Sequence, residues 1–305
     1  MPYGATLRTS LSDRHSDHPH AMKFALCQEL FTDRDFAAQC RTLAEMGYDG
    51  IEIAPFTLVH EGGDPTALPA SEREQLKAAI EDHGLDCVGL HWLLAKTEGF
   101  HLTTADEATR RRTADYLAGL ATLCHDLGGS VLVLGSPQQR SLEDGLSHEQ
   151  ADAHAIEVIT AALPTLIETG TVLALEPLSP AETDYMNSCR AARLLIEAIG
   201  SPHVRLHQDV KAMLGEPPVG GQQRSLPQLI REHADIVAHF HANDANLQGP
   251  GMGEVDFAPI FAALHETGYE GCVSVEVFDY APGADTIARE SLAYMQRVWD
   301  DVTNA

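Results

Sequence analysis

Four ionisable side chains stand at the ends of four apolar segments in the second half of the chain. Glu176 closes "LALE", Asp209 closes "RLHQD", His241 follows "AHF", and Glu276 lies in "VSVEV". A lone carboxylate in an apolar run is costly to bury, and converging carboxylates repel one another unless a cation lies between them. Carboxylate oxygens with one imidazole nitrogen suit Mn²⁺, Mg²⁺ or a similar divalent ion. The alternative, four polar side chains each satisfied by local hydrogen bonds, accounts less well for their recurrence at successive segments.

Eight short apolar segments alternate with longer helical patterns from Met22 onward. They begin at Lys23, Gly50, Leu85, Ser130, Thr171, His203, Ile236 and Cys272. This alternation predicts a single α/β domain, a (β/α)8 TIM barrel over residues 22–305, because right-handed crossovers close parallel strands in this way. A doubly wound open sheet is the alternative, but no G-x-G-x-x-G follows the first segment. In a barrel, all four ionisable groups would lie at the carboxyl ends of strands, where active sites form.

The helices between these segments carry start and stop signals. Thr32 or Asp33 is a candidate cap for the first helix, which Gly47 would close. Ser71, followed three residues later by Glu74, predicts a capping box at the start of the second helix.

Composition excludes several classes of partner. The 305 residues include 45 acidic and 20 basic side chains, a formal charge of −25 that repels a phosphate backbone, so no nucleic acid partner is expected. No apolar run approaches the roughly 18 residues of a membrane span. The six cysteines form no C-x-x-C pair and indicate free thiols in a reducing compartment, so we expect a cytoplasmic protein. Residues 1–21 are polar, without a hydrophobic signal core, and are expected to form a disordered extension.

Further motifs accompany these residues in a fixed order. They are "GYDGIEI", "LGGSVLVLGSPQQR", "LALEPLSPAETDYMNS", "LHQDVKAM", "HFHANDANLQGPGMGEVDF" and "GYEGCVSVEVF". Any one of them is weak evidence, but in this order and spacing they are strong. The chain from Met22 to near its end resembles the sugar phosphate isomerase/epimerase superfamily, the xylose isomerase-like TIM barrels.

The resemblance implies a carbohydrate-processing enzyme with one divalent ion. It carries the metal ligands onto Glu176, Asp209, His241 and Glu276, with Mn²⁺ as first choice and Mg²⁺, Co²⁺ or Zn²⁺ as alternatives. The two glutamates would also be the catalytic acid/base pair, moving a proton through a metal-stabilised enediolate in an epimerisation or isomerisation. Glu182 matches a glutamate that contacts substrate. The substrate would be a small sugar or keto-sugar, and assembly as a homo-oligomer or with a partner subunit is left open.

Two positions depart from the ketose epimerases of this family. Ala212 stands where those enzymes have a histidine, and Leu247 where they have an arginine. These departures keep open a lyase or dehydratase acting on a keto-sugar, an inosose or a keto-glycoside, including the C-glycoside-cleaving type. An endonuclease-like zinc hydrolase is a more distant alternative, since it needs more histidine ligands and a basic surface.

Other side chains are candidates for contacts around the centre. His207 and His239 lie two positions before expected ligands, so they should point into the barrel one layer deeper, as supporting or core histidines. Glu52 is inward by alternation and would meet substrate or a deeper hydrogen-bond partner. The candidates for substrate contact are His91 or Trp92, Arg140, Lys211 and Asp244. Arg140 has a loop salt bridge as its alternative, and Asp244 an Asx turn.

Overall fold

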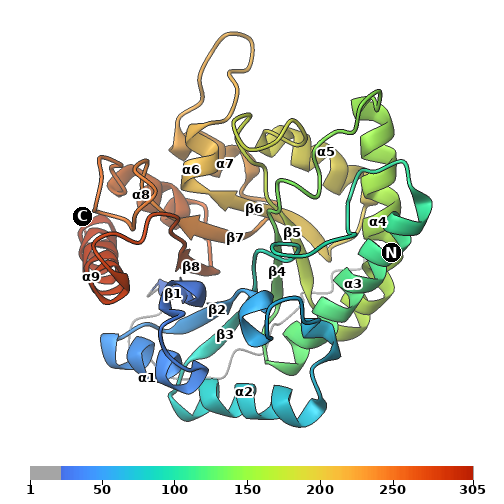
Figure 1. The fold of residues 1–305 in the computed structure, drawn as a ribbon. Coiled ribbons are helices and arrows are strands. Elements are labelled where there is room, and N and C mark those ends of the chain that lie inside the picture. The colour runs from blue at the N-terminus through green and yellow to red at the C-terminus, as the bar shows by residue number, and fades with distance from the viewer. Residues whose placement is uncertain (1–21, 305) are drawn as a thin grey trace, which may run out of the picture.

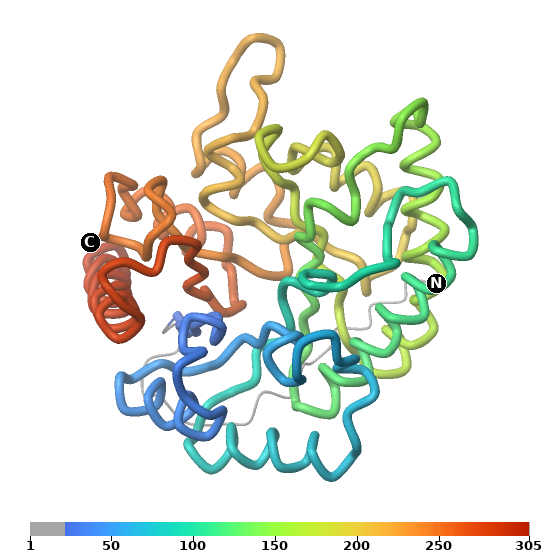
Figure 2. Tube along the Cα trace, in the orientation of Figure 1, coloured from blue at the N-terminus to red at the C-terminus, as the bar shows by residue number. Residues whose placement is uncertain are grey.

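Eight parallel strands close into a barrel in the computed structural model, which describes residues 22–304 (Figure 1). The strands are β1 (Lys23–Cys27), β2 (Gly50–Ile53), β3 (Asp86–Leu90), β4 (Val131–Leu134), β5 (Val172–Leu175), β6 (Val204–Asp209), β7 (Val237–Ala242) and β8 (Cys272–Val275). They follow one another in chain order, and β8 pairs with β1 to complete the ring. Figure 2 shows this closure, with the red end of the chain beside the blue one. The expected TIM barrel is confirmed.

Helices surround the ring on its outer side (Figure 1). They are α1 (Phe36–Met46), α2 (Ala70–Asp82), α3 (Glu107–Asp126), α4 (His148–Thr169), α5 (Cys189–Ile199), α6 (Val210–Leu214), α7 (Leu226–His233), α8 (Ala258–Glu266) and α9 (Ala284–Thr303). Short 3-10 helices follow β1 and β2, at Gln28–Phe31 and Pro55–Leu58, and a third lies at Pro65–Ala67. Most strand residues are apolar because both faces of the strands are covered, and polar residues gather in β6 and β7.

Two of the expected helix starts are wrong. The cap of α1 is Asp35, whose carboxylate accepts from the Ala38 N–H, because the 3-10 helix after β1 delays the start beyond Thr32 and Asp33. The start of α2 lies at Ala70 after Pro69, so Ser71 is already inside the helix and no capping box forms. The expected end of α1 is confirmed, since Gly47 closes that helix in the left-handed conformation, and Gly170 closes α4 in the same way.

The register of neighbouring strands places side chains at common levels inside the barrel. Asp209 pairs with His241, and His207 pairs with His239 one layer below. The β6–β7 register shifts just before His207, and the β2–β3 register shifts just before Glu52. Such irregularities turn side chains toward active sites. The expected second layer of histidines is therefore present beneath the four strand-end groups.

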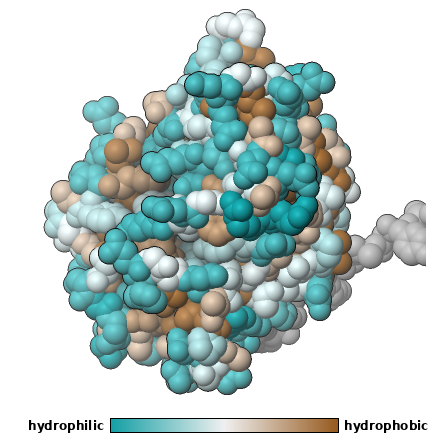
Figure 3. All heavy atoms as spheres, turned by 45° about the vertical axis from the view of Figure 1, so that its right-hand side comes forward, coloured by the Kyte–Doolittle hydropathy of each residue, from teal (hydrophilic) through white to brown (hydrophobic). Residues whose placement is uncertain are grey.

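The disordered extension expected for residues 1–21 lies outside the described residues. Within the described part of the chain, no helix has the length and apolar character needed to cross a membrane. The face drawn in Figure 3 is mostly hydrophilic, with apolar residues in scattered groups.

Candidate metal centre and active site

The structure brings three of the four strand-end groups, Asp209, His241 and Glu276, into one cluster, and Glu176 lines the same cavity as Glu276. Glu176 and Glu276 directly follow β5 and β8, while Asp209 ends β6 and His241 lies near the end of β7. All four are at most 5% exposed. One ligand atom each of Asp209, His241 and Glu276 lies within 4.8 Å of the others. Burial, and then the charges of Glu276 and Asp209, raise the pKa of the Glu176 carboxyl to about 8, so this carboxylate shares the same electrostatic environment.

A pair of facing atoms tests whether a cation fits. His241 Nδ1 lies 3.3 Å from Glu276 Oε2, and neither buried atom has a hydrogen-bond partner among the described residues. Buried polar atoms are rarely left unpaired, and here two of them point at one location beside the Asp209 carboxylate. A divalent ion with oxygen and nitrogen ligands would satisfy both, so the donor set fits such an ion.

Glu52 fixes the orientation of the His241 ring. Its two carboxylate oxygens lie 3.0 Å from His241 Nε2 and 2.7 Å from His239 Nε2. Burial alone would raise the pKa of Glu52, but His239 and His241 outweigh it and hold that pKa well below the usual value. An ionised carboxylate only accepts, so Nε2 of His241 carries a proton, and Nδ1 is the nitrogen that would bind a metal ion in place of its own proton. A carboxylate behind a ligating imidazole is the usual support of a metal site.

Asp209 is held from its other side by main chain and an amide. One carboxylate oxygen accepts from the Ala212 N–H at 2.7 Å, which makes Asp209 the cap of α6, and the other accepts from Asn243 Nδ2. Asn243 in turn accepts from the Lys211 N–H at 2.8 Å. Burial, followed by the charge of Glu276, raises the pKa of Asp209 to about 6.

Two side chains with aromatic rings, Trp92 and His91, hold the Glu276 carboxylate in place. Trp92 Nε1 donates to Oε1 at 2.6 Å, and His91 Nδ1 lies 3.4 Å from the same oxygen. Burial opposes ionisation of Glu276, but His241 and His91 hold its pKa well below the usual value. Oε2 is thereby directed at the centre.

Glu176 rests against a glycine. A Cβ built on Gly135 would lie 1.6 Å from Glu176 Oε2, so any larger residue there would displace the carboxylate. The main-chain oxygen of Glu176 accepts from Arg140 Nη1 at 2.7 Å, and Arg140 also donates to the main-chain oxygens of Ser136 and Leu134. Arg140 is 1% exposed, so the structure occupies its guanidinium with backbone and places it behind Glu176 rather than in the cavity.

A cavity of about 490 Å³ opens beside the centre, and both Glu176 and Glu276 line it. Three of the expected substrate-binding residues, Trp92, Glu182 and Lys211, are on its wall. Lys211 Nζ donates to Glu182 Oε1 at 2.6 Å and lies 3.9 Å from the centroid of the Phe278 ring. Trp92 stacks on Phe278 with ring centroids 6.0 Å apart. An aromatic wall with a charged pair suits a ligand that has both C–H faces and hydroxyls.

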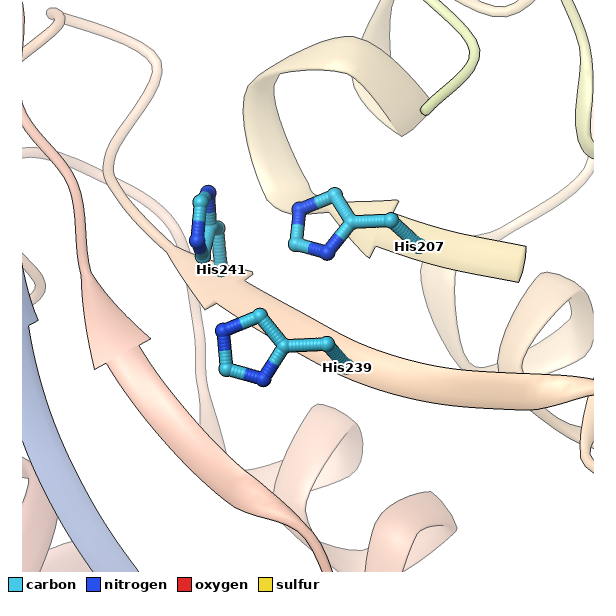
Figure 4. A group of neighbouring side chains, drawn as sticks. All are labelled: His207, His239 and His241. Atoms are coloured by element: carbon cyan, nitrogen blue, oxygen red, sulfur yellow. The ribbon is translucent and has the colours of Figure 1, made fainter. Parts of the chain in front are cut away.

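Of the other expected contact residues, His91 faces Glu276 and Asp244 lies away from the cavity wall; the expected supporting histidines, His207 and His239, are not on that wall either. Asp244 is fully buried, and its carboxylate accepts from the N–H groups of Gly253, Glu254 and Val255, so it folds the loop after β7. In Figure 4, His207 extends from β6 beside His241, and His239 extends from β7 below it. The centroid of the His207 ring lies 4.1 Å from that of His241. A separate cavity of about 470 Å³ lies at the amino ends of the strands, and its lining includes Lys23, Asp49 and Asp86 but none of the four expected metal ligands.

Sequence reasoning did not assign Asn243 or Phe278 to this region, and it left the partner of Glu52 open. Position after a strand end was the available signal for Asn243 and Phe278, which follow β7 and β8. Nothing in the sequence pointed to Glu29, which is 2% exposed and lies 2.9 Å from His91.

Glu52→Gln is expected to lower divalent-metal affinity by roughly 10- to 100-fold, the usual loss when support behind a ligand is removed. A glutamine side chain has only one amide oxygen, so it cannot accept from both His239 and His241 as the two carboxylate oxygens of Glu52 do. Calorimetric titration of metal-free protein with Mn²⁺ measures the change. Glu216→Gln is the matched control, since that buried carboxylate accepts from the Cys189 N–H, away from the centre. Equal affinities for both variants and the parent would contradict the role of Glu52.

The fold and the centre together define a class: a closed (β/α)8 barrel with three carboxylates and one imidazole at its carboxyl end. The family model of the xylose isomerase-like TIM barrel matches residues 40–298, and the chain belongs to this family.

Curated relatives extend over most of the chain. It is 26% identical over 292 residues to 3-dehydro-D-guloside 4-epimerase of Escherichia coli (strain K12), an alignment that covers 90% of this chain and 99% of the relative. It is 30% identical over 264 residues to L-ribulose 3-epimerase of Mesorhizobium japonicum, covering 85% and 80% of the two chains. Among solved structures, the apo form of 3-keto-D-glucoside 4-epimerase from E. coli superimposes with a TM-score of 0.77 at 22% identity, covering 91% of this chain and all of that one. The last similarity shows the fold.

Proposed function

We propose that the chain is a divalent-metal-dependent epimerase of a keto-sugar, with a 3-keto-glycoside as the favoured substrate class. The observation that carries the proposal is the pair of buried glutamates, Glu176 and Glu276, on the wall of one cavity beside the Asp209 and His241 side chains. β6 and β7 separate β5 from β8 in the ring, so the two carboxylates reach the cavity from different strands. The 3-dehydro-guloside epimerase activity of the relative that aligns over 99% of its length supports the substrate class.

The proton transfer is assigned to the two carboxylates. A divalent ion at the centre would polarise the substrate carbonyl and its neighbouring hydroxyl and acidify the C–H bond between them. One carboxylate oxygen of Glu176 or Glu276 takes this proton, and the other glutamate returns a proton to the opposite face. Trp92 and His91 hold Glu276 in place, and Gly135 leaves room for Glu176.

Side chains on the cavity wall would orient the sugar substrate. Trp92 and Phe278 offer faces for the sugar C–H groups, while Lys211 and Glu182 offer a donor and an acceptor for hydroxyls. Ala212 and Leu247, which stand where the ketose epimerases have a histidine and an arginine, are not on this wall, so the polar sugar contacts of those two side chains have no counterpart at these positions. This difference favours a substrate other than a free ketohexose.

Solvent-deuterium exchange tests the proposal. Mn²⁺-loaded protein in deuterium oxide is incubated with 3-keto-glucosides and with free ketohexoses, and nuclear magnetic resonance follows each position. The expected result is deuterium next to the carbonyl of a 3-keto-glycoside together with appearance of its epimer. Loss of a hydroxyl or of the aglycone from an exchanged substrate would instead support the lyase alternative, since one carbanion serves both outcomes. Absence of exchange from every carbonyl substrate would refute the proton-transfer role of the glutamates.

A further inference from the structure

A second group of side chains that can bind a metal ion lies beside the centre. Its members come from β1, the 3-10 helix that follows β1, and the end of β3, whereas the four expected metal ligands come from β5 to β8. Cys27 ends β1, Glu29 lies in the 3-10 helix that follows it, and His91 directly follows β3. One ligand atom of each lies within 4.8 Å of the others. None of the three is more than 2% exposed, so all are shielded from bulk water.

Glu29 has no hydrogen-bond donor for either carboxylate oxygen within the described residues. A buried carboxylate without a donor is costly, and a cation is the usual compensation. The nearest polar atom is His91 Nε2, 2.9 Å from Oε2. That nitrogen nevertheless has no hydrogen-bond partner within the described residues.

The other nitrogen of His91 explains this geometry. Nδ1 faces Glu276 Oε1 at 3.4 Å, and Glu276 already accepts from Trp92, so Glu276 is an acceptor and Nδ1 carries the ring proton. With Nδ1 as the donor to Glu276, Nε2 is the nitrogen through which the ring would bind a cation beside Glu29. Two lone-pair atoms at 2.9 Å repel each other unless a proton or a metal ion lies between them. An imidazole that binds metal through one nitrogen and donates to a carboxylate through the other is a common arrangement.

We propose that Cys27 Sγ, Glu29 and His91 Nε2 form a second cation site of the zinc type, distinct from the centre of Glu176, Asp209, His241 and Glu276. A thiolate, an imidazole and a carboxylate are the ligands of Zn²⁺ and Co²⁺, whereas three carboxylates and one imidazole suit Mn²⁺ or Mg²⁺. The three side chains leave a fourth position open. His91 would couple the two sites mechanically, because an ion on Nε2 fixes the ring whose Nδ1 holds Glu276. The inference does not depend on the epimerase reaction.

Cobalt spectroscopy on the intact chain tests the site directly. Metal-free protein is titrated with Co²⁺, and optical absorption and metal content are recorded together. Wild type should bind about two ions per chain, one of them with a thiolate-to-cobalt charge-transfer band in the near ultraviolet, and zinc should displace that ion first. Binding of one ion without this band would overturn the proposal regardless of how any variant folds.

Variants assign the ligands. Cys27→Ser should abolish the charge-transfer band, and Glu29→Gln should weaken binding of the thiolate-bound ion at least about tenfold. The Asp209→Asn variant should retain the band, which separates failure of this site from failure of the main centre. Cys40→Ser is the matched control, since Cys40 is a buried free thiol outside the group.

Cys27 also lies near Glu52 and His241, which is the alternative set of partners for its thiolate. A band that is lost in Cys27→Ser but unchanged in strength and affinity in Glu29→Gln would assign the thiolate to those residues and overturn the site.

Discussion

Glu176→Gln and Glu276→Gln are each expected to lower kcat by roughly 10²- to 10⁴-fold on the substrate that shows exchange, the usual contribution of a positioned acid or base. Glutamine keeps the size of glutamate but neither takes nor returns a proton. Among the described residues no side chain donates to the Glu176 carboxylate, whereas Glu276 accepts from Trp92, so Glu276→Gln will also disturb the indole contact. Initial rates with metal at saturation give kcat and KM separately.

Metal content distinguishes loss of proton transfer from loss of the ion. Each variant is analysed for bound Mn²⁺ before assay, and rates are compared per metal-loaded chain. Glu143→Gln is the control, because that carboxylate accepts from Thr104 and Ala105 in a loop away from the cavity wall. The double variant is expected to cost little more than the worse single one, since the two glutamates act as a unit. A metal-loaded Glu176→Gln protein with kcat within about tenfold of wild type would contradict the assigned acid/base pair.

Removal of divalent metal is expected to leave a protein whose stability falls as the pH rises from about 5 to 8. The folded-state pKa of Glu176 is raised from 4.5 to about 8, and that of Asp209 from 3.8 to about 6, in both cases first by burial and then by neighbouring carboxylates. The native state therefore binds these protons more tightly than the unfolded chain. The contribution is fully present below the unfolded pKa values and is lost as the pH passes through the folded ones.

Adding the ion should reverse this loss most strongly at the upper end of that range. Metal replaces the protons on the carboxylates, so affinity rises with pH, and an ion at 100 times its Kd contributes about 2.7 kcal/mol. Urea unfolding of metal-free and Mn²⁺-loaded protein across this range measures both effects. Other groups titrate in the same window, so the informative quantity is the difference between wild type and Glu176→Gln. A metal-free wild type whose stability relative to Glu176→Gln is flat with pH would refute the electrostatic account.

The metal-type centre depends on residues that hold its ligands as much as on the ligands themselves. Glu52 orients His241, Asn243 holds Asp209, and Trp92 directs Glu276. Each support comes from a different strand end from the ligand it holds. In a closed barrel the carboxyl ends of all strands face the same small volume, so a supporting residue on one strand can reach a ligand on another.

The amino-acid sequence by itself determined the barrel and the four strand-end groups. Apolar segments of fixed length alternating with amphipathic ones depend only on local periodicity, and the position of Glu176 or Asp209 at a segment end can be counted along the chain. Local signals failed where a neighbouring turn intervened, as at Asp35, which replaced the expected caps Thr32 and Asp33.

Only the tertiary structure decided which inward groups meet. Alternation placed Glu52 and His239 inside, but their contact across the barrel depends on strand register and on shifts at Glu52 and His207 that no local pattern encodes. In the same long-range geometry, Arg140 and Asp244 form hydrogen bonds with main-chain groups, so neither is in position for the substrate contact expected of it. It also placed Glu29 against His91, two residues 62 positions apart in sequence number whose meeting follows from closure of the ring. Spacing along a chain specifies which side chains reach the mouth of a barrel, whereas partner choice there is set by packing between strands that the sequence keeps far apart.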